Sequence, residues 1–440
     1  AILNPEGYTI HVHSDRIDIS ASACSGFFYA FQSLRQLMIR SLIDQRSYHI
    51  TCCYIVDEPR FPYRGMHLDV SRHLYPVDFI KSYIDWIALH KFNFFHWHLT
   101  DDQGWRIEIK KYPELTRVGS KRIRTRRGHQ NNPNPEFNDE EHNGFYRQDE
   151  IREIIRYAGD RHVQIIPEIE MPGHCQAVLA AYPHLSCTGG PHQVADHWGV
   201  FEDLFCAGNN KVYNFLEDVL SEVIELFPGK LIHIGGDECP KRRWKDCPKC
   251  QSRMHSDGLD RADQLKSCFT HRIYHILEKL NRRLIGWDEI LEDDLPLDAV
   301  IMVWRNQDIG VKAARKGHDV IMTPSSHCYF DHYQADPQSE PLAIGGFTPL
   351  EKVFQFDPTS NIMDVDAATH ILGGQGNVWT EYMPDTSDVE RMVFPRIAAL
   401  AERLWSPLNH RTYSDFYSAL SNLQKQYEIM GIRYYCADYL

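Results

Sequence analysis

Short apolar runs alternate with longer amphipathic stretches along the chain after residue 62. Eight of these runs have the length and apolar content of buried parallel strands: residues 65–70, 92–99, 163–169, 231–234, 284–287, 300–304, 319–322 and 371–375. Apolar residues recur at helical spacing between and after them, at residues 78–90, 148–160, 212–227, 263–280, 309–316 and 389–404. This alternation predicts an α/β fold, a (β/α)8 barrel, over residues 61–440. An open doubly wound sheet is the alternative, but no glycine-rich phosphate turn follows the first strand.

The first sixty residues follow a different pattern. Residues 9–13 and 16–20 alternate with period two around a Ser-Asp turn, which predicts a β-hairpin. Residues 26–42 have helical spacing, and residues 48–56 read as a further strand. A proline-bearing segment, residues 57–62, follows as a linker. We therefore predict a small α+β accessory domain over residues 1–60.

Composition narrows the classes of protein that the chain can represent. With 43% hydrophobic residues in 440, it can bury a large core, and its net charge of −13 argues against a nucleic-acid or anionic-membrane partner. No run of 18 apolar residues predicts a membrane span, and residues 1–7 have no signal-peptide pattern. The chain has no Asn-x-Ser/Thr glycosylation sequence. We therefore expect a bacterial source and a periplasmic, cell-surface or secreted location; the oligomeric state stays open.

In a (β/α)8 barrel the active site lies at the carboxyl ends of the strands. Carboxylates, tryptophans and histidines concentrate just after the predicted strands, and tryptophan faces suit the apolar faces of sugar rings. The composition therefore indicates a sugar pocket. The residues at these strand ends, in chain order, are Asp69, Ser71 and Arg72; His96, His98, Asp101 and Asp102; Glu168, Glu170 and His174; Asp237 and Glu238; Trp287, Asp288 and Glu289; Trp304 and Arg305; Tyr329 and Asp331; Trp379 and Glu381.

The segment His233-Ile-Gly-Gly-Asp-Glu238 is the most informative of these strand ends. Adjacent residues on a regular strand face opposite ways, so Asp237 and Glu238 reach one pocket only if the backbone turns, which Gly235 and Gly236 permit. The alternative is that the pair forms the N-cap and first turn of a helix.

Several segments resemble the family-20 β-N-acetylhexosaminidases: Arg64-Gly-Met-His-Leu-Asp-Val-Ser-Arg72, residues 94–106 (Phe-Phe-His-Trp-His-Leu-Thr-Asp-Asp-Gln-Gly-Trp-Arg), Pro167-Glu-Ile-Glu-Met-Pro-Gly-His174, Ile234-Gly-Gly-Asp-Glu238 and Gly376-Asn-Val-Trp-Thr-Glu381. The resemblance implies a catalytic barrel after a small α/β domain. It also implies exo-acting removal of terminal β-linked N-acetylglucosamine or N-acetylgalactosamine from a glycan, with retention of configuration and without cofactor or metal.

The implied mechanism is substrate-assisted, with the 2-acetamido carbonyl attacking C1 to give an oxazolinium intermediate. By resemblance Glu238 is the general acid and base, Asp237 accepts the acetamide N–H, and Tyr329 donates to the acetamido oxygen. A raised pKa of Glu238, from burial and from Asp237 and Glu170, is expected for its acid role. The resemblance also implies roles for nine other positions. Arg64 and Glu381 would clamp sugar hydroxyls, and Asp331 would bind hydroxyls as well. Trp287, Trp304 and Trp379 would enclose the sugar, and Asp101, Glu170 and His174 would be polar residues that support the acid.

Two features depart from the family pattern. The accessory domain is shorter than usual, so either its first half lies outside this chain or the domain is reduced. No tryptophan lies between Asp331 and Val365, where many members place a fourth pocket wall. Either Phe347 substitutes for it or the pocket is more open.

Four competing interpretations remain. His96-Trp-His98 has the spacing of a zinc-dependent amidohydrolase, although Asp237, Trp287 and Trp304 follow strands where that class needs histidines or a lysine. Cys247-Pro-Lys-Cys250, with Cys239 and His255, could bind zinc. The alternative interpretation is that these cysteines are buried or loop thiols that bind no metal. A catalytically silent lectin-like barrel is disfavoured by the intact Asp-Glu pair. Release of a disaccharide, as in lacto-N-biosidases, would use the same catalytic residues in a wider pocket.

Overall fold

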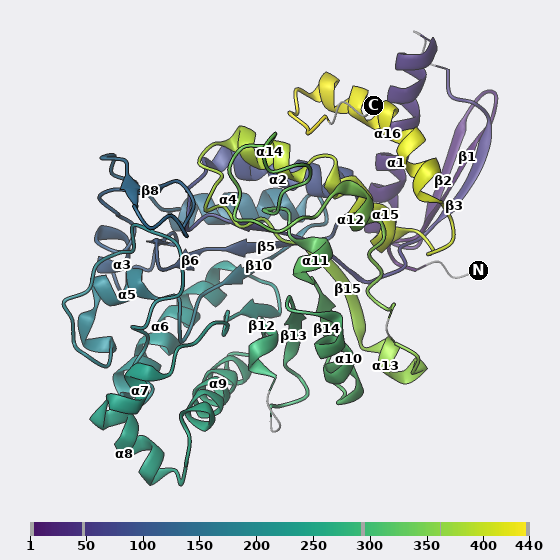
Figure 1. The fold of residues 1–440 in the computed structure, drawn as a ribbon. Helices are drawn as coiled ribbons and strands as arrows, with labels where there is room; N and C mark the ends of the chain where they lie inside the picture. Colours follow the sequence, from purple (N-terminus) through teal and green to yellow (C-terminus); the bar gives the residue numbers. More distant parts are fainter. Residues whose placement is uncertain (1–3, 46–48, 292–294, 361, 437–440) are drawn as a thin grey trace.

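The computed structural model describes residues 4–45, 49–291, 295–360 and 362–436. Eight parallel strands close into a barrel, and all eight strands predicted from the apolar runs are confirmed (Figure 1). Their order around the barrel follows the chain. The strands are β4 (Tyr63–Asp69), β5 (Phe94–His98), β10 (Gln164–Glu168), β11 (Leu231–His233), β12 (Arg283–Trp287), β13 (Val300–Val303), β14 (Val320–Met322) and β15 (Ile371–Gly376).

Amphipathic helices follow the strands and cover the barrel from outside. The predicted helix over residues 389–404 is wrong in one respect: it is two helices, because Pro395 cannot donate the backbone hydrogen bond that a continuous helix requires. The larger helices of the barrel region are α2 (Val77–Leu89), α4 (Gln148–Gly159), α6 (Asn210–Leu226), α9 (Ala262–Lys279), α10 (Gln307–Arg315), α14 (Thr386–Val393) and α15 (Arg396–Trp405).

Long loops at the carboxyl ends of the strands contain short elements of their own. Two small ribbons lie in the loop after β5, namely β6 (Thr100–Asp101) with β7 (Gly104–Trp105) and β8 (Arg126–Arg127) with β9 (Glu136–Phe137). The short helices there are α3 (Glu114–Arg117), α5 (Gln176–Ala181), η1 (Pro183–Leu185), α7 (Arg242–Asp246), α8 (Pro248–Ser256), η2 (Asp288–Ile290), α11 (Ser325–Cys328) and α12 (Leu350–Phe354). One more short helix, α13 (Val365–Thr369), leads directly into β15.

The accessory domain contains an antiparallel sheet in the order β2-β1-β3, with α1 (Cys24–Gln45) packed against it. The predicted hairpin is confirmed as β1 (Tyr8–Val12) and β2 (Ile17–Ala21), with Ile10 opposite Ile19. The third strand, β3 (Cys53–Asp57), is shorter than the predicted residues 48–56, the first of which lies outside the described residues.

Polar contacts join the accessory domain to the amino-terminal end of the barrel. The Arg64 guanidinium at the start of β4 lies 2.8 Å from Glu6 Oε1, and the Lys91 ammonium lies 2.9 Å from Asp57 Oδ2. Trp405, at the end of α15, packs into the core of the accessory domain and donates its indole N–H to Asp57. The last helix, α16 (Tyr413–Met430), packs against α1. In the described residues, no helix is long and apolar enough to cross a membrane.

Aliphatic and aromatic side chains fill the barrel interior beneath the strand ends. Ile166, Ile285, Met302 and Ile321 are fully buried there and contact Trp287 in one cluster. Because this layer closes the barrel from below, solvent and ligands reach the strand ends only from the opposite side.

Candidate active site

A pocket of about 330 Å³ opens at the carboxyl ends of the barrel strands. The carboxyl end of each of the eight strands, or the loop after it, contributes to its wall, as expected for a (β/α)8 barrel. Of the residues that the family resemblance assigns to the site, all line the pocket except Arg64 and Glu170. Of the other strand-end residues, Arg72 lines it, whereas Asp69, Ser71, His96, His98, Asp102, Glu168, Asp288, Glu289 and Arg305 do not. The lining residues are Arg72, Asp101, His174, Asp237, Glu238, Trp287, Trp304, Ser325, Tyr329, Asp331, His332, Ile344, Gly345, Gly346, Trp379 and Glu381.

The turn after β11 brings Asp237 and Glu238 into this pocket together. Gly235 and Gly236 have φ of 65° and 91°, in the left-handed region that glycine adopts without steric cost. A Cβ on Gly235 would lie 1.8 Å from Oε2 of Glu170, so the close approach also requires glycine. The predicted turn is therefore confirmed. The helix-cap alternative is wrong, because the next helix, α7, begins only at Arg242.

His174 connects the two carboxylates to a buried acidic pair. Its Nδ1 lies 2.9 Å from Asp102 Oδ2 and 3.3 Å from Asp101 Oδ1, while its Nε2 lies 3.4 Å from Glu238 Oε2 and 3.7 Å from Asp237 Oδ2. Burial disfavours the charged ring, but the charge of Asp101 and hydrogen bonds to both aspartates outweigh it and raise the pKa of His174 well above its ordinary value. The ring is therefore an imidazolium beside the Asp-Glu pair.

The pKa values of this pair are shifted in opposite directions. Burial is the main cause that raises the pKa of Asp237 to about 7; the charge of His174 opposes it, and the carboxylates of Glu289 and Glu168 add to it. The hydrogen bond from His174 lowers the pKa of Glu238 and outweighs burial. The expectation of a raised pKa for Glu238 is wrong for the ligand-free geometry, because its side chain is 41% exposed and the imidazolium lies beside it.

Arg72, and not Arg64, is the arginine that lines the pocket. Its guanidinium lies 2.9 Å from Asp101 Oδ2 and 3.5 Å from Glu381 Oε1. The predicted role of Arg64 in clamping sugar hydroxyls is wrong, because this residue is the second of β4, at the opposite end of the barrel, and pairs there with Glu6. Arg72 follows the carboxyl end of the same strand, where the chemistry of a barrel is expected.

Several carboxylate oxygens at the site have unused hydrogen-bonding capacity. They are buried, and none has a hydrogen-bond partner within the described part of the chain, which leaves them as acceptors for a ligand rich in hydroxyl or amide N–H groups. These atoms are Asp237 Oδ1, Asp331 Oδ1, Glu381 Oε2 and, behind the turn, Glu170 Oε2.

Three indoles and a phenol form the apolar walls. The rings of Trp287 and Trp379 lie 5.8 Å apart at 46°, and Trp304 stacks over Tyr329 with a centroid distance of 6.3 Å. Hydrogen bonds to Glu168 and Glu289 fix the N–H edges of Trp287 and Trp304. The indole faces thus remain available for the apolar face of a ligand.

The hydroxyl of Tyr329 is suited to donate a hydrogen bond. Burial raises its pKa well above the ordinary value, so the phenol keeps its proton. The protonated hydroxyl is therefore a donor for an acceptor in the pocket.

The fourth wall differs from the family pattern. Ile344, Gly345 and Gly346 line the pocket in this segment, whereas Phe347 is 52% exposed and is not among the lining residues. The expectation that Phe347 replaces the missing tryptophan is therefore wrong, and Ile344 with two glycines forms this side of the pocket.

The histidines of the His96-Trp-His98 segment serve a buried carboxylate. His98 Nδ1 bonds to Glu168 Oε2 at 2.5 Å and its Nε2 to Asp101 Oδ2 at 2.9 Å. Burial disfavours the charge, but Glu168 and Asp101 outweigh it and raise the pKa of His98 to about 10. With both ring nitrogens protonated, His98 has no lone pair for a metal, which disfavours the amidohydrolase interpretation.

Comparison with known proteins agrees with this geometry. The model of the glycosyl hydrolase family 20 catalytic domain matches residues 61–408, and the model of that family's domain 2 matches residues 1–58. A beta-hexosaminidase of Porphyromonas gingivalis is 44% identical over 98% of this chain, and one of Vibrio furnissii is 37% identical over 91%. The chain spans only 55% and 65% of the lengths of these two relatives.

Solved structures show the same architecture. A GH20 exo beta-N-acetylglucosaminidase from Vibrio harveyi, in complex with N-acetylglucosamine, has a TM-score of 0.87 at 34% identity, covering 99% of this chain and 68% of its own. A beta-N-acetylhexosaminidase from Bacteroides fragilis has a TM-score of 0.86 at 35% identity, covering 99% of this chain and 84% of its own.

Proposed function

The chain belongs to glycosyl hydrolase family 20, and on that premise we propose that it is a retaining exo-β-N-acetylhexosaminidase. Its substrates are glycans with a terminal β-linked N-acetylglucosamine or N-acetylgalactosamine. The observation that carries this proposal is the Asp237-Glu238 turn, which presents an unpaired buried acceptor, Asp237 Oδ1, in a pocket walled by indoles. Such a pocket matches a sugar that carries an amide N–H beside an apolar methyl group.

The reaction proceeds through the substrate's own acetamide. Asp237 accepts the amide N–H and balances the positive charge that develops as the carbonyl oxygen attacks C1, while Tyr329 donates to that oxygen. Glu238 protonates the leaving oxygen and then takes a proton from the water that opens the intermediate. Neither carboxylate bonds to carbon.

Substrate binding adjusts the two pKa values for these roles. A sugar in the pocket covers the exposed face of Glu238 and excludes water, which disfavours its carboxylate form and raises its pKa. The amide N–H and the charged ring of the intermediate stabilise ionised Asp237, which burial otherwise disfavours. The opposite shifts of the ligand-free pocket therefore reverse along the reaction.

Polar groups at the far side of the pocket hold the remaining hydroxyls. Asp331 and Glu381 provide the free acceptors, and Arg72 orients Glu381 through their 3.5 Å contact. Charge-assisted bonds of this kind fix the ring in register with the acid.

A panel of aryl glycosides tests the proposal. The N-acetylglucosaminide or N-acetylgalactosaminide should be turned over at least about 10³-fold faster than the plain glucoside and galactoside, because the neighbouring nucleophile is missing from the latter. The Glu238→Gln variant, purified in parallel, controls for contaminating activity, and NMR of the first product should show the β-anomer. Equal turnover of acetamido and plain sugars would contradict the proposal. Turnover restricted to an aryl disaccharide would instead identify a disaccharide-releasing enzyme.

A further inference from the structure

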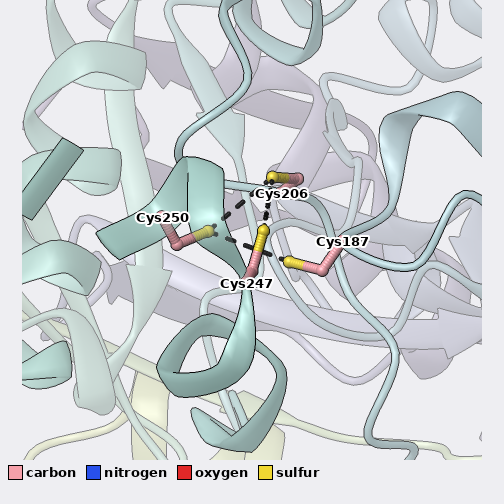
Figure 2. Close-up of side chains that lie close together, drawn as sticks. All are labelled: Cys187, Cys206, Cys247 and Cys250. Atoms are coloured by element: carbon pink, nitrogen blue, oxygen red, sulfur yellow. Dashed lines mark hydrogen bonds between the residues drawn. The ribbon is translucent and has the colours of Figure 1, made fainter. Parts of the chain in front are cut away.

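Four cysteines from two separate loops converge beside the active-site face (Figure 2). Cys187 and Cys206 come from the loop between β10 and α6, and Cys247 and Cys250 from the start of α8, in the loop after β11. Three of the four are buried and Cys187 is partly buried. We call this group the four-cysteine cluster.

The sulfur atoms of the four-cysteine cluster are spaced as metal ligands. Cys206 Sγ lies 3.7 Å from the sulfurs of both Cys247 and Cys250, and Cys187 Sγ lies 3.8 Å from Cys250 Sγ. All four sulfurs lie within 4.8 Å of one another. Disulfide sulfurs are about 2.05 Å apart. Sulfurs bound tetrahedrally to zinc at about 2.3 Å are about 3.8 Å apart, which matches the observed spacing.

The backbone around the cluster supports metal binding. Cys247-Pro-Lys-Cys250 has the two-residue spacing of zinc knuckles, and its second cysteine lies in the first turn of α8, where the helix dipole favours a thiolate. A Cβ on Gly208 would lie 2.2 Å from the Lys249 backbone, so the loop approaches α8 as closely as only glycine allows.

We propose that the four-cysteine cluster binds one structural Zn²⁺ ion through four thiolates. Each thiol loses its proton on binding, and four protein ligands leave no open position for a substrate or water. The cluster differs from the set that the sequence suggests. Cys239 is not part of it and His255 is exposed, whereas Cys187 and Cys206 complete it from the other loop.

The ion would fasten together the two loops that carry the acid–base residues. The loop after β10 includes His174, and the loop after β11 includes Glu238. Contacts next to the cluster join the same loops: Arg243 lies 2.8 Å from Asp203, and the Trp244 indole donates to the Phe205 carbonyl. A metal site there acts at a distance from the substrate, as a positioning element.

Metal analysis of the full chain tests the proposal. The protein is purified without immobilised-metal resin or chelator, and its metals are measured by mass spectrometry. We expect one zinc per chain, and cobalt substitution should give the intense visible bands of tetrahedral Co²⁺–thiolate. The Cys250→Ser variant should lose the zinc, whereas Cys239→Ser, a neighbouring thiol outside the cluster, should keep it. The parent should also lose several degrees of thermal midpoint with zinc-stripping chelator.

Other results would overturn the proposal. Iron in place of zinc, four freely reactive thiols without metal, or an intact mass lowered by two disulfides would each do so. These measurements on the parent protein stand even if Cys250→Ser fails to fold. None of them depends on the hydrolase activity, so the outcome is independent of the proposed function.

Discussion

Replacing Asp237 by asparagine should make the protein more stable at neutral and alkaline pH while impairing its activity. Burial is the main cause that raises the pKa of Asp237 from 3.8 to about 7. The charge of His174 opposes this rise, and the nearby carboxylates of Glu289 and Glu168 add to it. Since one pKa unit corresponds to about 1.4 kcal/mol, ionising this group in the folded protein costs at most about 4 kcal/mol relative to the unfolded chain.

The sign of the pH dependence follows from the direction of this shift. Below the unfolded pKa, Asp237 is protonated in both states and contributes no difference. As the pH rises from there toward the folded pKa of about 7, only the unfolded chain ionises, so the free energy of unfolding falls. The gain of Asp237→Asn should therefore be near zero at about pH 4 and reach its full value of a few kcal/mol at about pH 8.

Thermal midpoints measured across this pH range test the reasoning. The matched control is Asp149→Asn, because that side chain is 95% exposed on α4, lies outside the pocket and makes only an exposed ion pair with Arg152. Turnover of an acetamido glycoside by Asp237→Asn should fall by about 10²-fold or more, the usual cost of removing a group that stabilises transition-state charge. A midpoint at pH 8 equal to or below that of the parent would refute the assignment of Asp237 as a carboxylate held ionised at a cost.

Three further comparisons of variants separate catalytic from structural roles. Glu238→Gln should lose about 10²–10⁴-fold in rate on natural glycans. The loss should be far smaller on an activated dinitrophenyl glycoside, because its leaving group needs little protonation. Equal losses on both substrates would show that Glu238 is not the acid. Arg72→Met should raise KM by about 10-fold or more, because the pocket loses a charge-assisted contact. Arg64→Met should instead lower the thermal midpoint and leave kcat/KM of the folded protein unchanged. The reverse pattern would contradict the placement of the two arginines. Gly235→Ala places a methyl group 1.8 Å from a buried carboxylate oxygen and should reduce both stability and turnover. The control Gly159→Ala should reduce neither, because its added Cβ would meet no atom within 4 Å outside its own helix and chain neighbours. A fully active Gly235→Ala would refute the steric argument.

The pattern of the chain predicts the barrel well because each buried strand has its own local signal.

The two arginines near the first barrel strand, β4, show where a motif alone fails. Arg64 is the second residue of β4 and Arg72 follows the end of this strand, whose seven residues span about 23 Å at 3.3 Å per residue. Resemblance selected Arg64, although the rule that barrel chemistry lies after the strands favours Arg72.

Properties that depend on contacts between distant segments could not be predicted. Cys247-Pro-Lys-Cys250 is visible in the sequence, but Cys187 and Cys206 join it only because two loops pack together. The low pKa of Glu238 likewise depends on where the His174 ring lies, which no local pattern specifies.

The attachment of the accessory domain has a practical consequence. Glu6 and Asp57 hold this domain to the end of the barrel opposite the pocket. Two exposed thiols, Cys24 and Cys52, belong to it. Coupling the protein to a bead or an electrode through these thiols would leave the mouth of the barrel facing the solution, so that large, branched glycans could still approach an immobilised catalyst.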